Sequence, residues 1–142
     1  MHKNILIATD GTDASTRAIS EGLDLAREYG ARVIGVYIVD IDAFNIMDID
    51  PEDLERRKNT QIELGKGALD SLERLASLYR VDVEKVLREG EPAKEVLNIA
   101  KEYGADLIVA GTHGRKGFKK LLCRSVSDSF IKDAQCPVVV AH

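Results

Sequence analysis

The chain has no tryptophan and few other aromatic residues: its 142 residues include 4 tyrosines and 3 phenylalanines. Aromatic rings are the usual stacking platforms for nucleic-acid bases, so their scarcity argues against a base-stacking surface. No stretch approaches the roughly 20 apolar residues that a membrane-spanning helix needs. The apolar run near the N-terminus is also too short for a signal peptide. From the sequence we expect a cytoplasmic protein that binds neither nucleic acid nor a membrane.

Cysteine is equally scarce, and the patterns of common catalysts are missing. Cys123 and Cys136 fit no metal-ligand spacing and no disulfide framework. There is no Gly-x4-Gly-Lys-Ser/Thr phosphate loop and no Gly-x-Gly-x-x-Gly after the first apolar run. A Gly-x-Ser-x-Gly nucleophile elbow is absent as well. The sequence therefore predicts no catalytic residue and no metal-ligand set.

What is present is a regular alternation of apolar runs and helical patterns. The apolar runs predict strands at residues 4–9, 32–39, 81–88, 107–110 and 137–142. The periodic segments between them predict helices at residues 14–29, 51–79, 93–103 and 125–134. Such alternation, with short connections and no repeat or linker, predicts one α/β domain spanning residues 1–142. Its parallel sheet should be doubly wound, with helices on both faces.

The charge of the chain is unevenly distributed. Residues 111–127 contain five basic residues and no acid. Because the whole chain has a net charge of −4, the remainder carries −9. A local basic loop on an acidic body favours a small anionic partner over a surface that coats nucleic acid.

The loop of residues 111–125 has the features of an anion site. Ligands of open parallel sheets bind beyond the carboxyl ends of the strands, where the strand order reverses. Gly111 and Gly114 would let backbone N–H groups approach a phosphate, since neither has a Cβ. Ser125 and Val126 would present unpaired N–H groups at the start of a helix. Asp10, after the first strand, is either a contact for a ligand hydroxyl or amine or the acceptor of a local turn.

Four fragments together resemble a known family: ILIATDGTDAS, the Gly-x-Pro of REGEPAKEV, GTHGR, and CPVVVAH. In this combination the chain resembles the universal stress protein family over its whole length. The resemblance implies a five-stranded, Rossmann-like parallel sheet in the order 3-2-1-4-5. In that order Asp10 and Gly111 would face the same crevice.

The resemblance also implies a site for ATP or a related adenine nucleotide, with Mg²⁺ on the phosphates. Members that bind ATP share the motif Gly-x2-Gly-x9-Gly-Ser/Thr. In this chain Arg124 occupies the position of the third glycine. By resemblance, Asp10 and the backbone at Val39 would hold the adenosine end. The full set of implied binding residues is Thr9, Asp10, Val39, Ala110, Gly111, Thr112, Gly114, Arg124, Ser125 and Val126.

Arg124 leaves two interpretations open. Where a phosphate must approach closely, an arginine in place of glycine costs about 1 kcal/mol or more and closes the pocket. Alternatively, its guanidinium pairs with a phosphate. The chain is thus predicted to be a nucleotide-binding stress or signalling protein with at most very slow ATP hydrolysis. The alternative is a dimeric interaction module that binds no nucleotide.

A homodimer is also expected. The resemblance implies one, and the order 3-2-1-4-5 puts Val138, Val139 and Val140 on an apolar strand at the edge of the sheet. An unpaired edge of this kind can pair with its own copy across a two-fold axis.

Overall fold

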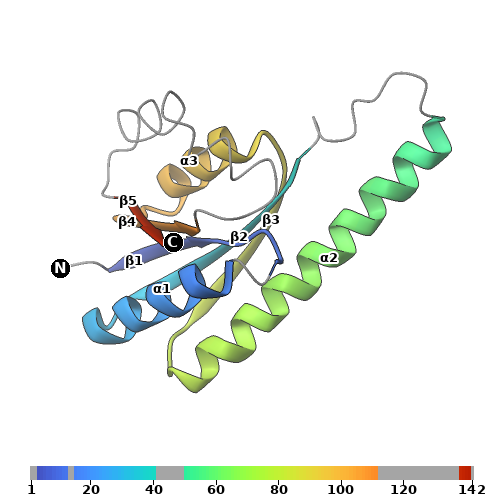
Figure 1. Cartoon of the computed structure of the whole chain (residues 1–142). Coiled ribbons are helices and arrows are strands. Elements are labelled where there is room, and N and C mark those ends of the chain that lie inside the picture. Colours follow the sequence, from blue (N-terminus) through green and yellow to red (C-terminus); the bar gives the residue numbers. More distant parts are fainter. Residues whose placement is uncertain (1–2, 13–14, 41–49, 112–137, 142) are drawn as a thin grey trace.

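The structure, a computed structural model, describes residues 3–12, 15–40, 50–111 and 138–141; for residues 111 and 138–141 it describes only the backbone. The predicted helix at residues 125–134 lies outside this part of the chain. The elements are β1 (Asn4–Ala8), α1 (Thr16–Tyr29), β2 (Arg32–Asp40), α2 (Pro51–Leu78), β3 (Val83–Gly90), α3 (Pro92–Glu102), β4 (Leu107–Gly111) and β5 (Val138–Ala141) (Figure 1).

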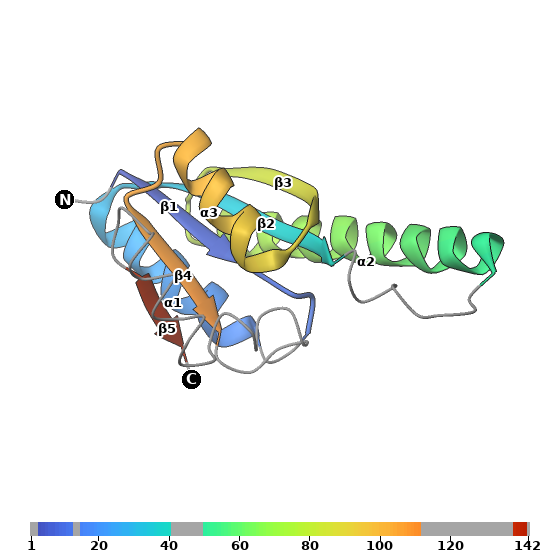
Figure 2. The same ribbon diagram turned by 90° about the horizontal axis from the view of Figure 1, so that it is seen from above.

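The strands form one parallel sheet in the order β3-β2-β1-β4-β5. Helices α1 and α2 cover one face, and α3 covers the other (Figures 1 and 2). The α/β class, the parallel sheet and the helices on both faces are therefore confirmed.

The side chains of β1 show why its run is apolar throughout. Ile5 and Ile7 join the core beneath α1 and α2, whereas Leu6 and Ala8 join the core beneath α3. Side chains alternate between the two faces of a strand, and both faces are covered here. A central strand of this sheet consequently has no polar side.

Helix α2 is much longer than the strands it covers. It begins where predicted: Asp50 caps it by accepting a hydrogen bond from Glu52 N at 3.1 Å, and Pro51 occupies its first turn. Its 28 residues span about 42 Å. Its packing on the sheet begins at Gln61 and Ile62, and the turns before them project beyond the ends of β2 and β3 (Figure 1). Leu54, in the projecting part, is 36% exposed although it belongs to the apolar pattern of the helix.

The two glycines of α2 play different parts. A Cβ on Gly65 would lie 2.6 Å from both Leu87 Cδ1 and Tyr37 Cδ1, so this glycine lets the helix approach the sheet closely. A Cβ on Gly67 would meet nothing within 4 Å. A close contact therefore explains the glycine at position 65 and not the one at position 67.

The predicted start of the third strand was wrong by two residues. After α2 the chain turns through Arg80 with a φ of 58°. Val81 N then donates a hydrogen bond to Ala76 O at 3.0 Å. Val81 therefore closes the end of α2 and buries its side chain, and pairing with β2 begins at Val83.

Candidate functional site

The strand order reverses between β1 and β4. From β1 the chain proceeds outward to β2 and β3, and β4 lies on the opposite side of β1. The register pairs Ile7 with Val109, so Thr9 follows β1 at the level where Gly111 ends β4. The residues after β1 and the end of β4 therefore lie side by side at the carboxyl edge of the sheet, at the switch point whose crevice binds ligands in sheets of this type.

The turn after β1 contains the buried polar residues of the described chain. Thr9 is 1% exposed, Asp10 4% and Ser15 4%. A buried polar group must be hydrogen-bonded to avoid a cost of several kcal/mol, and a buried charge costs more. The contacts of these three side chains therefore decide what the turn can do.

Asp10 organises the turn through one carboxylate oxygen. Its Oδ1 accepts hydrogen bonds from Thr12 N at 2.9 Å and from Thr12 Oγ1 at 2.5 Å. This is an Asx turn, the local role anticipated for Asp10. It fixes the direction of the carboxylate without excluding a ligand contact.

Thr9 and Ser15 fasten the turn to the start of α1. Ser15 Oγ donates to Thr12 O at 2.8 Å, so its single hydrogen is used there. The 2.9 Å contact between Thr9 Oγ1 and Ser15 Oγ must then have Thr9 as the donor. Thr9 Oγ1 in turn accepts from Gly11 N at 3.2 Å, where Gly11 has a φ of 79°. The turn is thus held by internal contacts in the absence of any ligand.

Strand β2 runs further than its neighbour β1. The β1–β2 register ends at Ala8 opposite Val36, but β2 continues to Asp40 and stays paired with β3 on its other side. The edge of β2 that faces β1 therefore extends into the crevice.

The backbone N–H and C=O groups of successive β2 residues point alternately toward β1 and toward β3. Thr9 N donates to Val36 O at 2.9 Å, so the N–H and C=O of Val36 are directed toward β1. In a parallel strand this direction alternates with each residue. The backbone groups of Ile38 therefore face the crevice, and those of Val39 face β3. Val39 itself is fully buried against α2. The backbone groups on the crevice side of β2 are thus those of the residue before Val39, a difference that only the register reveals.

The described part of the β4 end consists of small residues. Ala110 is 4% exposed and packs in the core beneath α3, and Gly111 is the last residue of the strand. The other predicted site residues, Thr112, Gly114, Arg124, Ser125 and Val126, lie outside the described residues. The structure thus brings together Thr9, Asp10, Ala110 and Gly111 and adds Ile38.

A tyrosine connects this turn to α2. Tyr37 is 2% exposed, and its ring would lie 3.5 Å from a Cβ on Gly11. The same ring packs against Gly65 of α2, and its hydroxyl donates to Gln61 Oε1 at 2.9 Å. Tyr37 therefore packs between α2 and the turn, beside Ala68 of α2, whose Cβ would lie 3.6 Å from a Cβ on Gly11.

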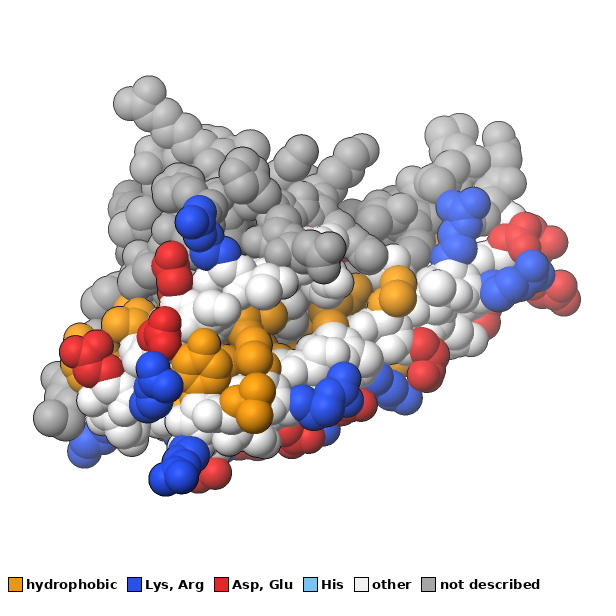
Figure 3. All heavy atoms as spheres, turned by 60° about the horizontal axis from the view of Figure 1, so that its bottom comes forward, with side chains coloured by type: hydrophobic (Ala, Val, Ile, Leu, Met, Phe, Trp, Pro, Cys, Tyr) orange, Lys and Arg blue, Asp and Glu red, His pale blue; other side chains and the backbone are white. Residues whose placement is uncertain are grey.

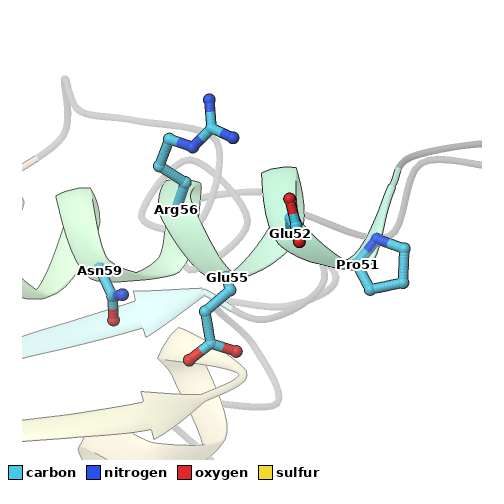
Figure 4. A pocket seen from close by; sticks show the side chains of 5 residues that line it. All are labelled: Pro51, Glu52, Glu55, Arg56 and Asn59. Atoms are coloured by element: carbon cyan, nitrogen blue, oxygen red, sulfur yellow. The ribbon is translucent and has the colours of Figure 1, made fainter.

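A shallow hollow lies at the projecting start of α2, lined by Pro51, Glu52, Glu55, Arg56 and Asn59. Figure 4 shows Glu55 and Arg56 pointing to different sides of the helix. All the described lining residues come from one exposed helix, and none of them belongs to the crevice. We assign no ligand to it.

Four shifted pKa values belong to exposed ion pairs along β3. Hydrogen bonds between Lys85 and Asp70 lower the pKa of Asp70 and raise that of Lys85, which Glu73 raises further. A paired hydrogen bond between Arg88 and Glu102, at 3.0 and 2.8 Å, raises the pKa of Arg88 and lowers that of Glu102. These ion pairs lie at the outer edge of the sheet and not at the crevice.

The described residues hold neither a metal-binding cluster nor a membrane-spanning helix. No cluster of three or more His, Cys, Asp or Glu side chains there could hold a metal ion. None of the helices in that part of the chain is long and apolar enough to cross a membrane.

Comparisons with known proteins agree on one family. A family model described as the universal stress protein family matches residues 1–142. Universal stress protein MJ0531 of Methanocaldococcus jannaschii is 35% identical over 140 residues, covering 99% of this chain and 82% of that protein. Universal stress protein UspA from Lactobacillus plantarum shares the fold with a TM-score of 0.82 at 24% identity, covering 99% and 97% of the two chains.

Two further structural neighbours were determined with bound nucleotides. One is a universal stress protein in complex with cAMP, with a TM-score of 0.73 at 21% identity over 99% of this chain and 97% of the neighbour. The other is the Archaeoglobus fulgidus universal stress protein in complex with dAMP, with a TM-score of 0.68 at 21% identity over 99% and 98%. At these identities the likeness to this chain concerns the fold.

Proposed function

The chain belongs to the universal stress protein family, and on that premise we propose that it binds an adenine nucleotide in the crevice beyond β1 and β4. The observation that carries this proposal is the buried carboxylate of Asp10, held by Thr12 at the point where the strand order reverses. Binding of cAMP and dAMP by two proteins of the same fold supports the choice of ligand.

The adenosine end is proposed to lie between β2 and the turn after β1. The N–H and C=O of Ile38 can pair with the edge of an adenine base much as a neighbouring strand would. Asp10 can accept a hydrogen bond from a ribose hydroxyl or an exocyclic amine. Because Thr9, Ser15 and Gly11 already fix the turn, little ordering is needed when the ligand binds.

The phosphates are proposed to follow the chain beyond β4. Gly111 admits a close backbone approach there. Thr112, Gly114, Ser125 and Val126 would supply further hydrogen-bond donors, with Mg²⁺ on the phosphates of ATP. In this proposal the guanidinium of Arg124 pairs with a phosphate instead of closing the site. Any hydrolysis would be slow, because no side chain is assigned to orient the attacking water.

The remaining features of the proposal concern assembly and location. The protein would act in the cytoplasm as a homodimer joined by β5, through Val138, Val139 and Val140. Strand β5 pairs with β4 on one side only in the described structure. Its other edge is suited to a second copy of itself.

Arg124 favours one competing function, a dimeric interaction module without nucleotide. The two functions are separated by calorimetric titration of the nucleotide-stripped protein with AMP and with ATP, each with and without Mg²⁺. We expect micromolar binding by the parent protein. An Asp10→Ala variant should bind at least tenfold more weakly, since a hydrogen bond to a charged group contributes about 1.5–3 kcal/mol. Asp24→Ala, which removes an exposed carboxylate of α1, is the matched control.

An Arg124→Gly variant completes the titration. Binding by the variant alone would show that Arg124 closes the site, and the interaction module would then be the better proposal. Absence of binding by both proteins would refute the nucleotide-binding function.

A further inference from the structure

One flank of α2, between the side that packs on the sheet and the side open to solvent, carries an uncharged stripe. Its members recur every three or four residues, so they lie along one side of the helix. We call them the α2 stripe: Leu64, Gly67, Ala68, Ser71, Leu75 and Leu78. The stripe extends over 14 residue steps, which is about 21 Å along the helix.

Two of the three leucines of this stripe are exposed to solvent. Leu78 is 80% exposed and Leu64 47%, while Leu75 and Ala68 are half-buried. Figure 3 shows hydrophobic side chains gathered on this face, where α1 and α2 lie over the sheet. A contiguous exposed apolar surface of this kind is typical of a protein–protein contact.

Gly67 adds a separate observation. Glycine destabilises the interior of a helix relative to alanine, and at Gly65 the close approach to Tyr37 and Leu87 explains it. Around Gly67 there is no atom within 4 Å of the Cβ position. No contact within the described chain requires a glycine here, and the open space above it could receive a side chain from outside.

We propose that the α2 stripe binds the same stripe of a second copy, antiparallel, about a two-fold axis at Ser71. In this register Leu75 of each copy lies opposite Gly67 of the other, so the leucine fills the space above the glycine. Leu64 of each copy lies opposite Leu78 of the other. Every contact occurs twice, as an isologous interface requires.

The charged residues beside the stripe fit the antiparallel arrangement. Arg74, whose Nη2 donates to Ser71 Oγ at 3.1 Å, lies one helical turn from Asp70 on the same flank. Within the chain Asp70 also pairs with Lys85 of β3, at 2.9 Å. Antiparallel packing about Ser71 brings Arg74 of one copy near Asp70 of the other, twice. Parallel packing would place Arg74 against Arg74 and Gly67 against Gly67, which adds repulsion and leaves a void. Both charge and shape therefore favour a second copy of α2 in the antiparallel orientation.

The position and size of the stripe determine what kind of assembly it makes. Helix α2 packs on β2 and β3, at the opposite edge of the sheet from β5. The two surfaces can therefore be used together, and this inference depends neither on nucleotide binding nor on pairing of β5. One helix pair lies at or below the roughly 1,200 Å² of a stable interface. We accordingly expect association that depends on protein concentration in the micromolar range.

Disulfide cross-linking tests the two-fold register. In a background with Cys123→Ser and Cys136→Ser, a Ser71→Cys variant places the two thiols at the axis, within reach of a disulfide. Ser77→Cys, on an exposed flank of the same helix outside the stripe, is the matched control. Mild oxidation should convert most of the Ser71→Cys protein to covalent dimer and leave the Ser77→Cys protein unlinked. Equal cross-linking of the two variants would overturn the proposal.

Sedimentation of the full chain tests the surface itself. Leu78→Glu changes a side chain so exposed that folding is unaffected, and Leu54→Glu, outside the stripe, is the control. Leu78→Glu should halve the mass of the assembly at tens of micromolar: to a dimer if β5 also pairs, and to a monomer if it does not. Leu54→Glu should match the parent. An equal mass for the parent and Leu78→Glu at all concentrations would refute the second copy as partner.

Discussion

The turn after β1 and the outer side of α2 break the usual distribution of side chains in opposite ways. The turn buries polar groups, with Thr9, Asp10 and Ser15 each at most 4% exposed. The α2 stripe exposes apolar ones, with Leu78 at 80%. Buried polar groups and large exposed apolar surfaces are the informative exceptions in a folded protein. The first kind fits a small polar ligand and the second a protein partner.

The two regions also differ in what holds them in place. The turn is fixed by hydrogen bonds among its own side chains. The segment of α2 that carries the stripe is held on the sheet by the apolar packing of Leu69, Leu72 and Ala76. Tyr37 and Ala68 link the two regions, since both lie next to Gly11 and Tyr37 also packs on Gly65. Substitutions near this link should therefore affect the two regions differently.

The largest expected effect concerns the two glycines of α2. Gly65→Ala forces Tyr37 and Leu87 to move, and overpacking of this kind costs about 1–3 kcal/mol, partly offset by the better helix propensity of alanine. Gly67→Ala meets nothing and should stabilise the monomer by up to about 1 kcal/mol. Urea unfolding at low protein concentration measures both. If the two free energies of unfolding change in the same direction, α2 does not pack as described.

A smaller effect is expected inside the turn. Thr9→Val keeps the shape of the side chain but removes the hydrogen bonds that Thr9 Oγ1 makes with Ser15 Oγ and Gly11 N, at a cost of about 1–2 kcal/mol. Thr60→Val is the control, because the Thr60 hydroxyl donates to Arg56 O on an exposed surface. Thermal unfolding should separate the two variants by several degrees. Equal melting temperatures would show that the buried network contributes nothing to the turn.

The smallest effect is expected at the outer edge of the sheet, away from both regions. Arg88 lowers the pKa of Glu102 through their paired hydrogen bond. This contribution to stability is present above the unfolded pKa of about 4.3 and is lost as the pH falls through the lower folded value. Glu102→Gln should therefore show a shallower loss of stability on acidification than the parent, with Glu21→Gln as the exposed control. Identical acid-unfolding curves for all three would refute a stabilising pair.

Much of the fold could be predicted from the chain alone, because its signals are local. The apolar run of β1 and the Asp50–Pro51 start of α2 mark their elements without any knowledge of the partners. The exposure of Leu54 could not be predicted, because the helical pattern does not reveal where the sheet beneath it ends.

The site illustrates the same limit. Asp10 was found from its place after a strand, because carboxyl ends of parallel strands share an edge. The sequence singles out Val39, whereas the backbone groups on the crevice side of β2 belong to Ile38, because this direction depends on the β1–β2 register. The partners Thr12 and Ser15 were missed too, since short polar side chains after a strand suggest a turn without specifying its hydrogen bonds.

Amide NMR spectroscopy of the nucleotide-stripped chain, titrated with ATP and Mg²⁺, tests the central claim most directly. Our account predicts that the largest shifts among the described residues fall on the amides of Ile38, Asp10, Gly11 and Gly111, and that those of Leu64, Ser71 and Leu78 stay unchanged at constant protein concentration. Saturable shifts confined to the α2 stripe, or no shifts at millimolar ATP, would contradict the assignment of the crevice as a nucleotide site.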